Sequence, residues 1–157
     1  MLFRSEHAPE RFSYAHLPER VAAAFREALA CHSAGLLQAF AVMCRATTQA
    51  MLDDLGERSR LRIFDQVAEV RILADIDDVT FNAIRRVLFE GEAARGQTTP
   101  PLTRPQAAVL LETMKDLLYQ TYIRRAKLQQ ALRLRQFPAV AAVTPAVDQS
   151  APRSAGR

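Results

Sequence analysis

Thiols and imidazoles could serve as metal ligands, nucleophiles or general bases, so they are the first side chains to consider. The 157-residue sequence contains two cysteines, Cys31 and Cys44, and three histidines, His7, His16 and His32. Their positions match no known zinc-site spacing, and no serine or cysteine is paired with a plausible histidine base. Without a secretory signal, both thiols are expected to be reduced in a cytoplasmic protein. The sequence therefore predicts no metal site and no cofactor.

Two clusters of acidic residues could bind calcium or act as an acid–base pair. Three carboxylates fall within residues 75–78. In a calcium-binding loop that began here, the fifth position would be valine, and the glycine that should follow is absent. Capping of a helix by Asp77 or Asp78 is the better interpretation. Glu90 and Glu92 have arginines nearby, so ion pairs at helical spacing explain them more simply than catalysis does. Because a glycine-rich phosphate loop is also absent, we predict that the protein is not an enzyme.

Basic residues are concentrated at the C-terminal end of the chain. The whole sequence has a net charge of +4, but residues 121–157 alone contain seven basic residues and one acidic residue. Residues 1–120 therefore have a net charge of −2. A basic end can hold phosphate or another anionic surface, whereas cations near a helix end also stabilise its carbonyl groups. Both interpretations stay open, and helix stabilisation is the simpler one.

The elements that must position these residues are helices, because apolar residues recur at three- and four-residue steps without two-residue alternation. The expected helices cover about residues 17–31, 34–55, 59–73, 78–95 and 103–135. In the second helix the expected apolar face consists of Leu37, Phe40, Cys44, Thr47, Met51 and Leu55. The residues expected to face inward from the third and fourth helices are Leu61, Phe64, Val67, Ala68, Val79, Ala83, Ile84, Val87 and Leu88. We therefore predict an all-α bundle of about five helices, with the second and fifth as its central pair.

Capping residues predict where these helices begin and end. Ser33 is the expected N-cap of the second helix, and Gly56 is its C-terminal stop. The fifth helix is expected to begin at Thr103, with Pro105 in its first turn, and to end at Phe137-Pro138. The chain then divides into an irregular N-terminal segment (1–16), a helical domain (17–135) and a flexible basic tail (136–157), which we expect to be disordered.

Composition favours a soluble globular protein. Hydrophobic residues make up 49% of the chain and charged residues 24%, so a sizeable core can form. No uninterrupted apolar stretch approaches the roughly 18 residues that a membrane helix needs. Charged and polar residues interrupt the first few positions, so no signal peptide is expected.

Several blocks of sequence carry a family resemblance. They cover residues 17–21, 27–31, 39–46 and 51–56, followed by the arginine-rich stretch 85–95. In this order they resemble the bacterial family called domain of unknown function 4145, over about residues 15–125. Arg45 matches an arginine near the middle of a helix in that family, although the glutamate that commonly follows it is replaced here.

That family is similar to the HEPN superfamily, helical dimers that include metal-independent ribonucleases. In those enzymes an arginine stabilises charge on the phosphate, and a histidine a few residues later accepts the proton of the ribose 2′-hydroxyl. Arg86 matches the arginine, or Arg85 does if the register shifts by one. Arg95 stands in place of the histidine, and Gly91 replaces a usual asparagine. Because arginine stays protonated at neutral pH, the resemblance implies a degenerate motif without its base.

The resemblance and the charge distribution lead to two hypotheses. The first is a non-catalytic, HEPN-like interaction module, a homodimer that acts through a protein partner. The second is a nucleic-acid-binding protein, or a residual ribonuclease, that uses its arginine-rich helix end. A membrane-surface helix over residues 121–135 ranks last, because its apolar face is incomplete. The residues expected to contact a partner or nucleic acid are Arg45, Arg85, Arg86, Arg95, Arg124, Arg125 and Lys127.

Overall fold

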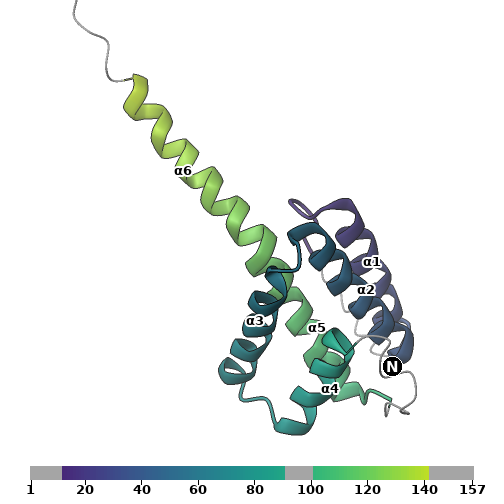
Figure 1. Ribbon diagram of the computed structural model, residues 1–157. Helices are drawn as coiled ribbons and strands as arrows, with labels where there is room; N and C mark the ends of the chain where they lie inside the picture. The colour runs from purple at the N-terminus through teal and green to yellow at the C-terminus, as the bar shows by residue number, and fades with distance from the viewer. Residues whose placement is uncertain (1–11, 91–100, 142–157) are drawn as a thin grey trace, which may run out of the picture.

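A computed structural model describes residues 12–90 and 101–141, with side chains up to residue 135. Its helices are α1 (Glu19–Ser33), α2 (Leu37–Leu55), α3 (Ser59–Leu73), α4 (Asp78–Phe89), α5 (Arg104–Leu118) and α6 (Arg124–Ala141), with a π-helical segment η2 (Tyr119–Ile123) between the last two. The described ranges contain no strand, and α5, η2 and α6 form one continuous rod (Figure 1). The predicted all-α bundle of about five helices is confirmed.

The first two helices form a hairpin whose turn depends on a glycine. Gly35 has a φ of 73°, in the left-handed region that favours glycine. Its N–H donates to the carbonyl of His32 at 3.0 Å, and the N–H of Leu36 donates to that of Cys31 at 2.9 Å. This glycine termination ends α1 at Ser33. The prediction that Ser33 is the N-cap of α2 is therefore wrong, because α1 continues two residues further than expected.

The core lies between the α1–α2 hairpin and the helices packed against it. α1 lies along α2 over most of its length, while α5 contacts α2, α3 and α4 (Figure 1). The predicted central pair of α2 and α5 is in contact, and these two helices contact most of the others, although α1 is the most extensive neighbour of α2. Phe12 and Tyr14, in the segment expected to be irregular, pack against Phe25 with ring centroids 4.9 and 6.4 Å away.

The predicted apolar face of α2 is confirmed in its central part. Phe40, Cys44, Thr47 and Met51 are fully buried, and Leu37 and Leu55 are half-buried at its two ends. The buried hydroxyl of Thr47 donates to the carbonyl of Met43 at 2.8 Å. This bond removes the cost of burying an unpaired hydroxyl. Gly56, with a φ of 83°, ends the helix as predicted.

The helix over Ser59–Leu73 has its predicted bounds, but its buried face differs from the predicted one. Ile63 and Val67, one turn apart, are buried. Leu61 is 76% exposed, so the prediction that it faces inward is wrong. The same prediction is wrong for Val79 in the first turn of α4, which is 73% exposed. The other predicted inward residues are buried or half-buried: Phe64, Val67, Ala68, Ala83, Ile84, Val87 and Leu88.

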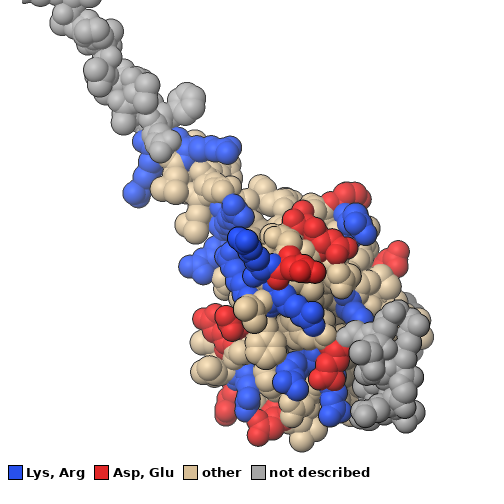
Figure 2. Space-filling view, in the orientation of Figure 1, with Lys and Arg blue, Asp and Glu red and all other residues tan. Residues whose placement is uncertain are grey.

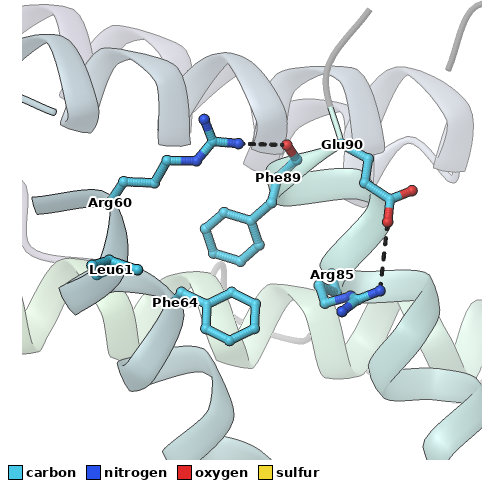
Figure 3. Close-up of a pocket in the computed structure, with 6 residues that line it drawn as sticks. All are labelled: Arg60, Leu61, Phe64, Arg85, Phe89 and Glu90. Atoms are coloured by element: carbon cyan, nitrogen blue, oxygen red, sulfur yellow. Dashed lines mark hydrogen bonds and ion pairs between the residues drawn. The ribbon is translucent and has the colours of Figure 1, made fainter. Parts of the chain in front are cut away.

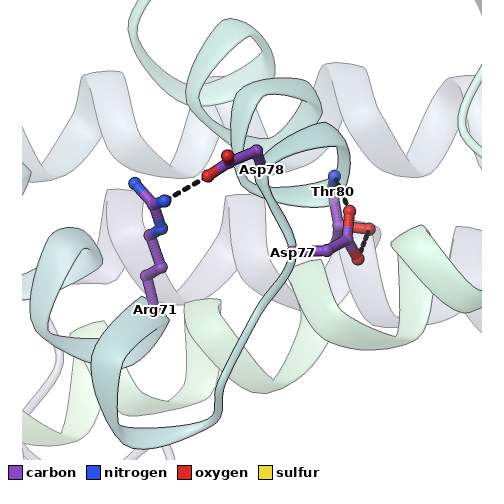
Figure 4. A network of polar contacts seen from close by, with 4 residues as sticks. All are labelled: Arg71, Asp77, Asp78 and Thr80. Carbon is purple, nitrogen blue, oxygen red and sulfur yellow. Dashed lines mark hydrogen bonds and ion pairs between the residues drawn. The ribbon is translucent and has the colours of Figure 1, made fainter.

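The acidic cluster at residues 75–78 caps α4, as predicted (Figure 4). One oxygen of Asp77 accepts from the backbone N–H of Thr80 at 2.8 Å, and the other accepts from its hydroxyl at 2.8 Å. These bonds favour the charged carboxylate and lower the pKa of Asp77. The neighbouring Asp78 forms an ion pair with Arg71 of α3. Asp77 therefore caps α4, and Asp78 connects the first turn of α4 to α3.

α5 begins next to Thr103, as predicted, and its first turn is stabilised by a capping box. The Thr103 hydroxyl accepts from the N–H of Gln106 at 3.3 Å, and the Gln106 side chain accepts from the N–H of Thr103 at 3.1 Å. At its other end the rod passes Pro138 and continues to Ala141. The predicted end at residues 137–138 is therefore wrong, and the fixed φ of proline, about −65°, is itself a helical value. Residues 136–141 of the predicted tail are therefore helical, and residues 142–157 lie outside the described part.

The last helix, α6, projects away from the body formed by α1–α5 (Figure 1). Its packing contacts are with η2, the segment from which it continues. None of the helices in the described ranges combines the length and apolarity needed to cross a membrane.

Candidate functional site

The residues predicted to contact a partner lie on three different helices. Arg45 is on α2, Arg85 and Arg86 are on α4, and Arg124, Arg125 and Lys127 are on the first turn of α6. Arg95 falls outside the described residues, as do Gly91 and Glu92. The structure gives different surroundings to each group, so each is described separately.

Arg45 connects two helices of the body. Its Nε donates to the carbonyl of Val87 at 3.0 Å. That carbonyl is in the last turn of α4, where no further helical N–H is available to it. Arg45 therefore has a structural role at this helix end, and its side chain is already engaged.

Arg85 lines a hollow between α3 and α4 that we call the α3–α4 hollow (Figure 3). The hollow has a volume of about 290 Å³. Its lining consists of Arg60, Leu61, Phe64, Arg85, Phe89 and Glu90. Two cations, a carboxylate and three apolar side chains thus meet at one opening.

The polar groups of the α3–α4 hollow are only partly satisfied. Arg60 donates from Nη2 to the carbonyl of Phe89 at 3.2 Å. An Nη2 atom of Arg85 lies 3.6 Å from a carboxylate oxygen of Glu90, which makes an ion pair without a close hydrogen bond. The Nε of Arg85 is buried and has no hydrogen-bond partner among the described residues. Arg85 therefore keeps unused capacity to donate.

The apolar part of the α3–α4 hollow is built by two rings. Phe64 and Phe89 have centroids 5.4 Å apart and lie between the two arginines (Figure 3). Leu61 stands beside them with most of its surface exposed. This floor gives the hollow an apolar surface that water contacts.

Arg86, the next residue on α4, points to a different surface. It is exposed and lines a second hollow of about 400 Å³ between α4 and the start of α5. Asn82, Thr103 and Gln106 supply the other polar side chains there, and the remaining lining is apolar. Arg85 and Arg86, which the sequence treats as equivalent candidates, are thus separated by the structure.

The basic residues of α6 are exposed in two groups, one at the base of the helix and one farther along it. Arg124, Arg125, Lys127, Arg133 and Arg135 are all exposed. The Lys and Arg side chains along this helix are evident in Figure 2, and α6 itself contains no acidic residue. Three exposed leucines lie among the cations: Leu128, Leu132 and Leu134, with 55%, 60% and 68% of their surface exposed.

The base of α6 is fixed to the body by polar contacts from η2. The hydroxyl of Tyr122 donates to a carboxylate oxygen of Asp54 at 3.0 Å, and the hydroxyl of Thr121 donates to the side chain of Gln66 at 3.4 Å. Burial of the Tyr122 ring and its bond to Asp54 raise the pKa of its phenol. η2 therefore determines where α6 leaves the body.

Conventional catalytic groups are not assembled in the described part of the chain. Within residues 12–90 and 101–141, no three His, Cys, Asp or Glu side chains are arranged to hold a metal. His32 packs edge-on against Phe40 at a centroid distance of 4.9 Å. Burial raises the pKa of the Cys44 thiol, which keeps it protonated and unreactive.

Sequence reasoning missed most of the α3–α4 hollow, although the sequence holds a signal for it. Arg60 and Phe64 are four residues apart, and so are Arg85 and Phe89. Each pair lies on one face of its helix, so a repeated Arg-x-x-x-Phe spacing could have pointed to these faces. It could not have shown that the two faces meet.

Comparisons with protein-family models, with curated proteins and with solved structures find no match to this chain. The geometry of the α3–α4 hollow and of α6 is thus the basis for a functional conclusion, and the resemblance to the domain of unknown function 4145 stays a prediction.

Proposed function

We propose that this protein is a non-catalytic helical interaction module that binds an acidic partner protein through α6. The carrying observation is that α6 projects from the body with exposed leucines among cations. In keeping with the sequence resemblance, the proposal includes a HEPN-like body and a homodimer. An interaction module of this kind needs no cofactor and no metal.

The chemistry of α6 explains why a partner of opposite charge is needed. Residues 117–147 contain no acidic side chain, so α6 has no Glu–Lys or Glu–Arg pair at helical spacing. Such pairs stabilise isolated helices, whereas neighbouring cations repel each other. Most helices in proteins are stabilised by packing of an apolar face, and the described side chains of α6 are exposed or half-buried. A partner that supplies carboxylates would therefore stabilise α6 as it binds.

The leucines favour a protein partner over other anions. Leu128 and Leu132 are one turn apart and lie on the same face of α6. An amphipathic helix of a partner could cover this apolar pair and place its acidic residues beside Arg124 and Arg125. Nucleic acid offers phosphates to the cations, but it has little use for an aliphatic face.

A binding experiment with paired variants tests this proposal. The full chain is titrated with a synthetic peptide whose helix carries leucine on one face and glutamate on both sides. The Leu128→Gln/Leu132→Gln and Arg124→Gln/Arg125→Gln variants are each expected to weaken binding by about tenfold, because each loses about 1.4 kcal/mol or more. Arg58→Gln/Arg62→Gln, at the N-cap and in the first turn of α3, is the matched control for charge.

Nucleic-acid binding is the second candidate, and the run of cations without an acidic neighbour on α6 favours it. Single-stranded RNA and duplex DNA are titrated at roughly 50 and 200 mM salt, since phosphate binding releases counterions and weakens steeply with salt. The decisive result would be tight nucleic-acid binding that Arg124→Gln/Arg125→Gln loses and Leu128→Gln/Leu132→Gln keeps. That result would favour nucleic acid, in place of a protein, as the partner of α6. Sedimentation velocity on the same samples tests the homodimer.

A further inference from the structure

We propose that the α3–α4 hollow is a binding site for a carboxylate that is attached to an apolar group. This site lies between α3 and α4 and does not depend on the function of α6. Each half of the expected ligand follows from one part of the lining.

The floor of the hollow selects an apolar group of limited size. Phe64 and Phe89 lie in ring contact, and the exposed Leu61 extends the surface they form (Figure 3). At about 290 Å³ the hollow is slightly smaller than the range typical of small-molecule sites. It therefore suits one ring or a short alkyl chain, and it is too small for a nucleotide cofactor.

The two arginines select the anionic group. Arg60 and Arg85 approach the rings from different helices, and Arg60 uses one Nη atom to hold the carbonyl of Phe89. The Nη2 of Arg85 lies 3.6 Å from the carboxylate of Glu90, beyond hydrogen-bond distance, and 42% of the Arg85 side chain is exposed to an incoming ligand. A guanidinium can donate two parallel hydrogen bonds to a carboxylate, so Arg85 is the expected anchor.

The carboxylate of Glu90 is itself paired with Arg85, so it would compete with an incoming carboxylate for this arginine. Glu90 already faces Arg85, and 45% of its side chain is exposed. An incoming carboxylate would take the place of Glu90 beside Arg85, and the Glu90 side chain would turn into solvent. Removal of the Glu90 charge should therefore strengthen binding, which is the opposite of the effect of removing Arg85.

The same chemistry could come from a free small acid or from the C-terminal carboxylate of a peptide that ends in an apolar residue. The probes are therefore 3-phenylpropionate and N-acetyl-glycyl-phenylalanine, each compared with its neutral amide. Binding to the full chain is followed by NMR titration. The variants are Arg85→Gln, Glu90→Gln and, as a matched control from the adjacent position on α4, Arg86→Gln.

We expect at least one acid to bind saturably and its amide to bind roughly tenfold more weakly, which is the loss of one charge-assisted contact. Arg85→Gln should weaken binding by about the same factor, Glu90→Gln should tighten it by roughly threefold or more, and Arg86→Gln should leave it within about twofold. Preference for the small acid or for the peptide identifies the source of the carboxylate, and either result supports the site.

Three results would overturn the proposal. They are the absence of saturable binding by both acids, equal binding of acid and amide, and equal losses in Arg85→Gln and Arg86→Gln. Circular dichroism checks that each variant is folded. If Arg85→Gln does not fold, Glu90→Gln decides alone, because unchanged or weaker binding in that variant contradicts the competition by Glu90.

Discussion

Arginine side chains from two helices stabilise the C-terminal end of α4. Arg45 of α2 donates to the carbonyl of Val87, and Arg60 of α3 donates to the carbonyl of Phe89. Both carbonyls belong to the last turn of a helix, where backbone acceptors lack helical donors and the helix dipole favours cations. These residues thus hold three helices together, while Arg85 keeps donors free beside them.

Replacement of Arg45 by glutamine should lower the free energy of unfolding by about 1 kcal/mol, the net value of one hydrogen bond. Urea denaturation measures the loss. Arg62→Gln on α3, an exposed position, serves as the control and should stay within about 0.5 kcal/mol of the parent. Equal stability of Arg45→Gln and the parent would remove the structural role assigned to Arg45.

Phe40 tests the core of α2. It is fully buried and packs against the ring of His32, so Phe40→Ala should lower the free energy of unfolding by about 3–5 kcal/mol. Val42→Ala on the same helix is the control, because 64% of that side chain is exposed. A loss below about 1 kcal/mol for Phe40→Ala would contradict its place in the core.

At the scale of elements, η2 is the feature that relates α6 to the body. π-Helical turns inside α-helices are rare, and those that occur often lie at functional sites. Here Thr121 and Tyr122 of η2 bond to Gln66 of α3 and to Asp54 at the end of α2. The direction of α6, and hence the position of its basic surface, depends on these contacts.

Because of the Tyr122–Asp54 hydrogen bond, the free energy of unfolding should fall at alkaline pH. The pKa of Tyr122 is raised in the folded protein. Its contribution to the free energy of unfolding is therefore complete below the ordinary phenol pKa of about 10. This contribution is lost as pH rises through the pKa that Tyr122 has in the folded protein. Tyr122→Phe should lower stability at pH 7 by about 1 kcal/mol and reduce the loss of stability above about pH 10.

Absorbance at 295 nm follows the tyrosine titration directly. Burial also raises the pKa of Tyr14, so two of the three tyrosines should ionise late in the parent. Tyr122→Phe should remove one of these late ionisations, and Tyr119→Phe is the matched control at the exposed end of η2. An unchanged late titration in Tyr122→Phe would contradict the Asp54 contact.

At the scale of the whole molecule, a packed body carries a projecting helix. The buried side chains come from α1–α5, from the loop residue Leu102 and from Ile123 in η2, whereas the described side chains of α6 are exposed or half-buried. The body should therefore be stable without α6, and α6 should be the part that responds to a partner.

Truncation of the chain after Arg125 tests this division. The melting temperature of the body should change by less than about 3 °C, because little buried surface is lost and 1 kcal/mol corresponds to several degrees for a domain of this size. Differential scanning calorimetry measures the transition. A drop of more than about 10 °C would show that α6 contributes to the core.

The whole protein is also expected to lack ribonuclease activity, with or without divalent metal. Arg95 stands where the resembled family has histidine, and arginine cannot accept a proton at neutral pH. The measurement is cleavage of a labelled RNA by the purified chain. Cleavage that persists through purification and disappears in Arg86→Ala would contradict the non-catalytic interpretation.

Local features were predictable from the sequence. Periodicity predicted which segments are helical and the buried face of α2, since one apolar stripe must face the core. It was wrong about the end of the helix expected over residues 78–95, because α4 ends at Phe89. Gly56, Asp77 and Thr103 marked helix ends, because capping needs only backbone geometry and short-range hydrogen bonds. Ser33 misled the prediction, since both serine at an N-cap and glycine after a helix are favourable and Gly35 decided the outcome.

Which surfaces meet was decided by the tertiary structure alone. The sequence places Arg60 and Arg85 on separate helices, and only the packing of α3 beside α4 brings them around Phe64 and Phe89. The sequence also places Arg85 and Arg86 next to each other. Successive residues of a helix point about 100° apart, so these two side chains reach different hollows. Periodicity is a property of one helix, but the α3–α4 hollow and the projection of α6 depend on contacts between residues far apart in the chain.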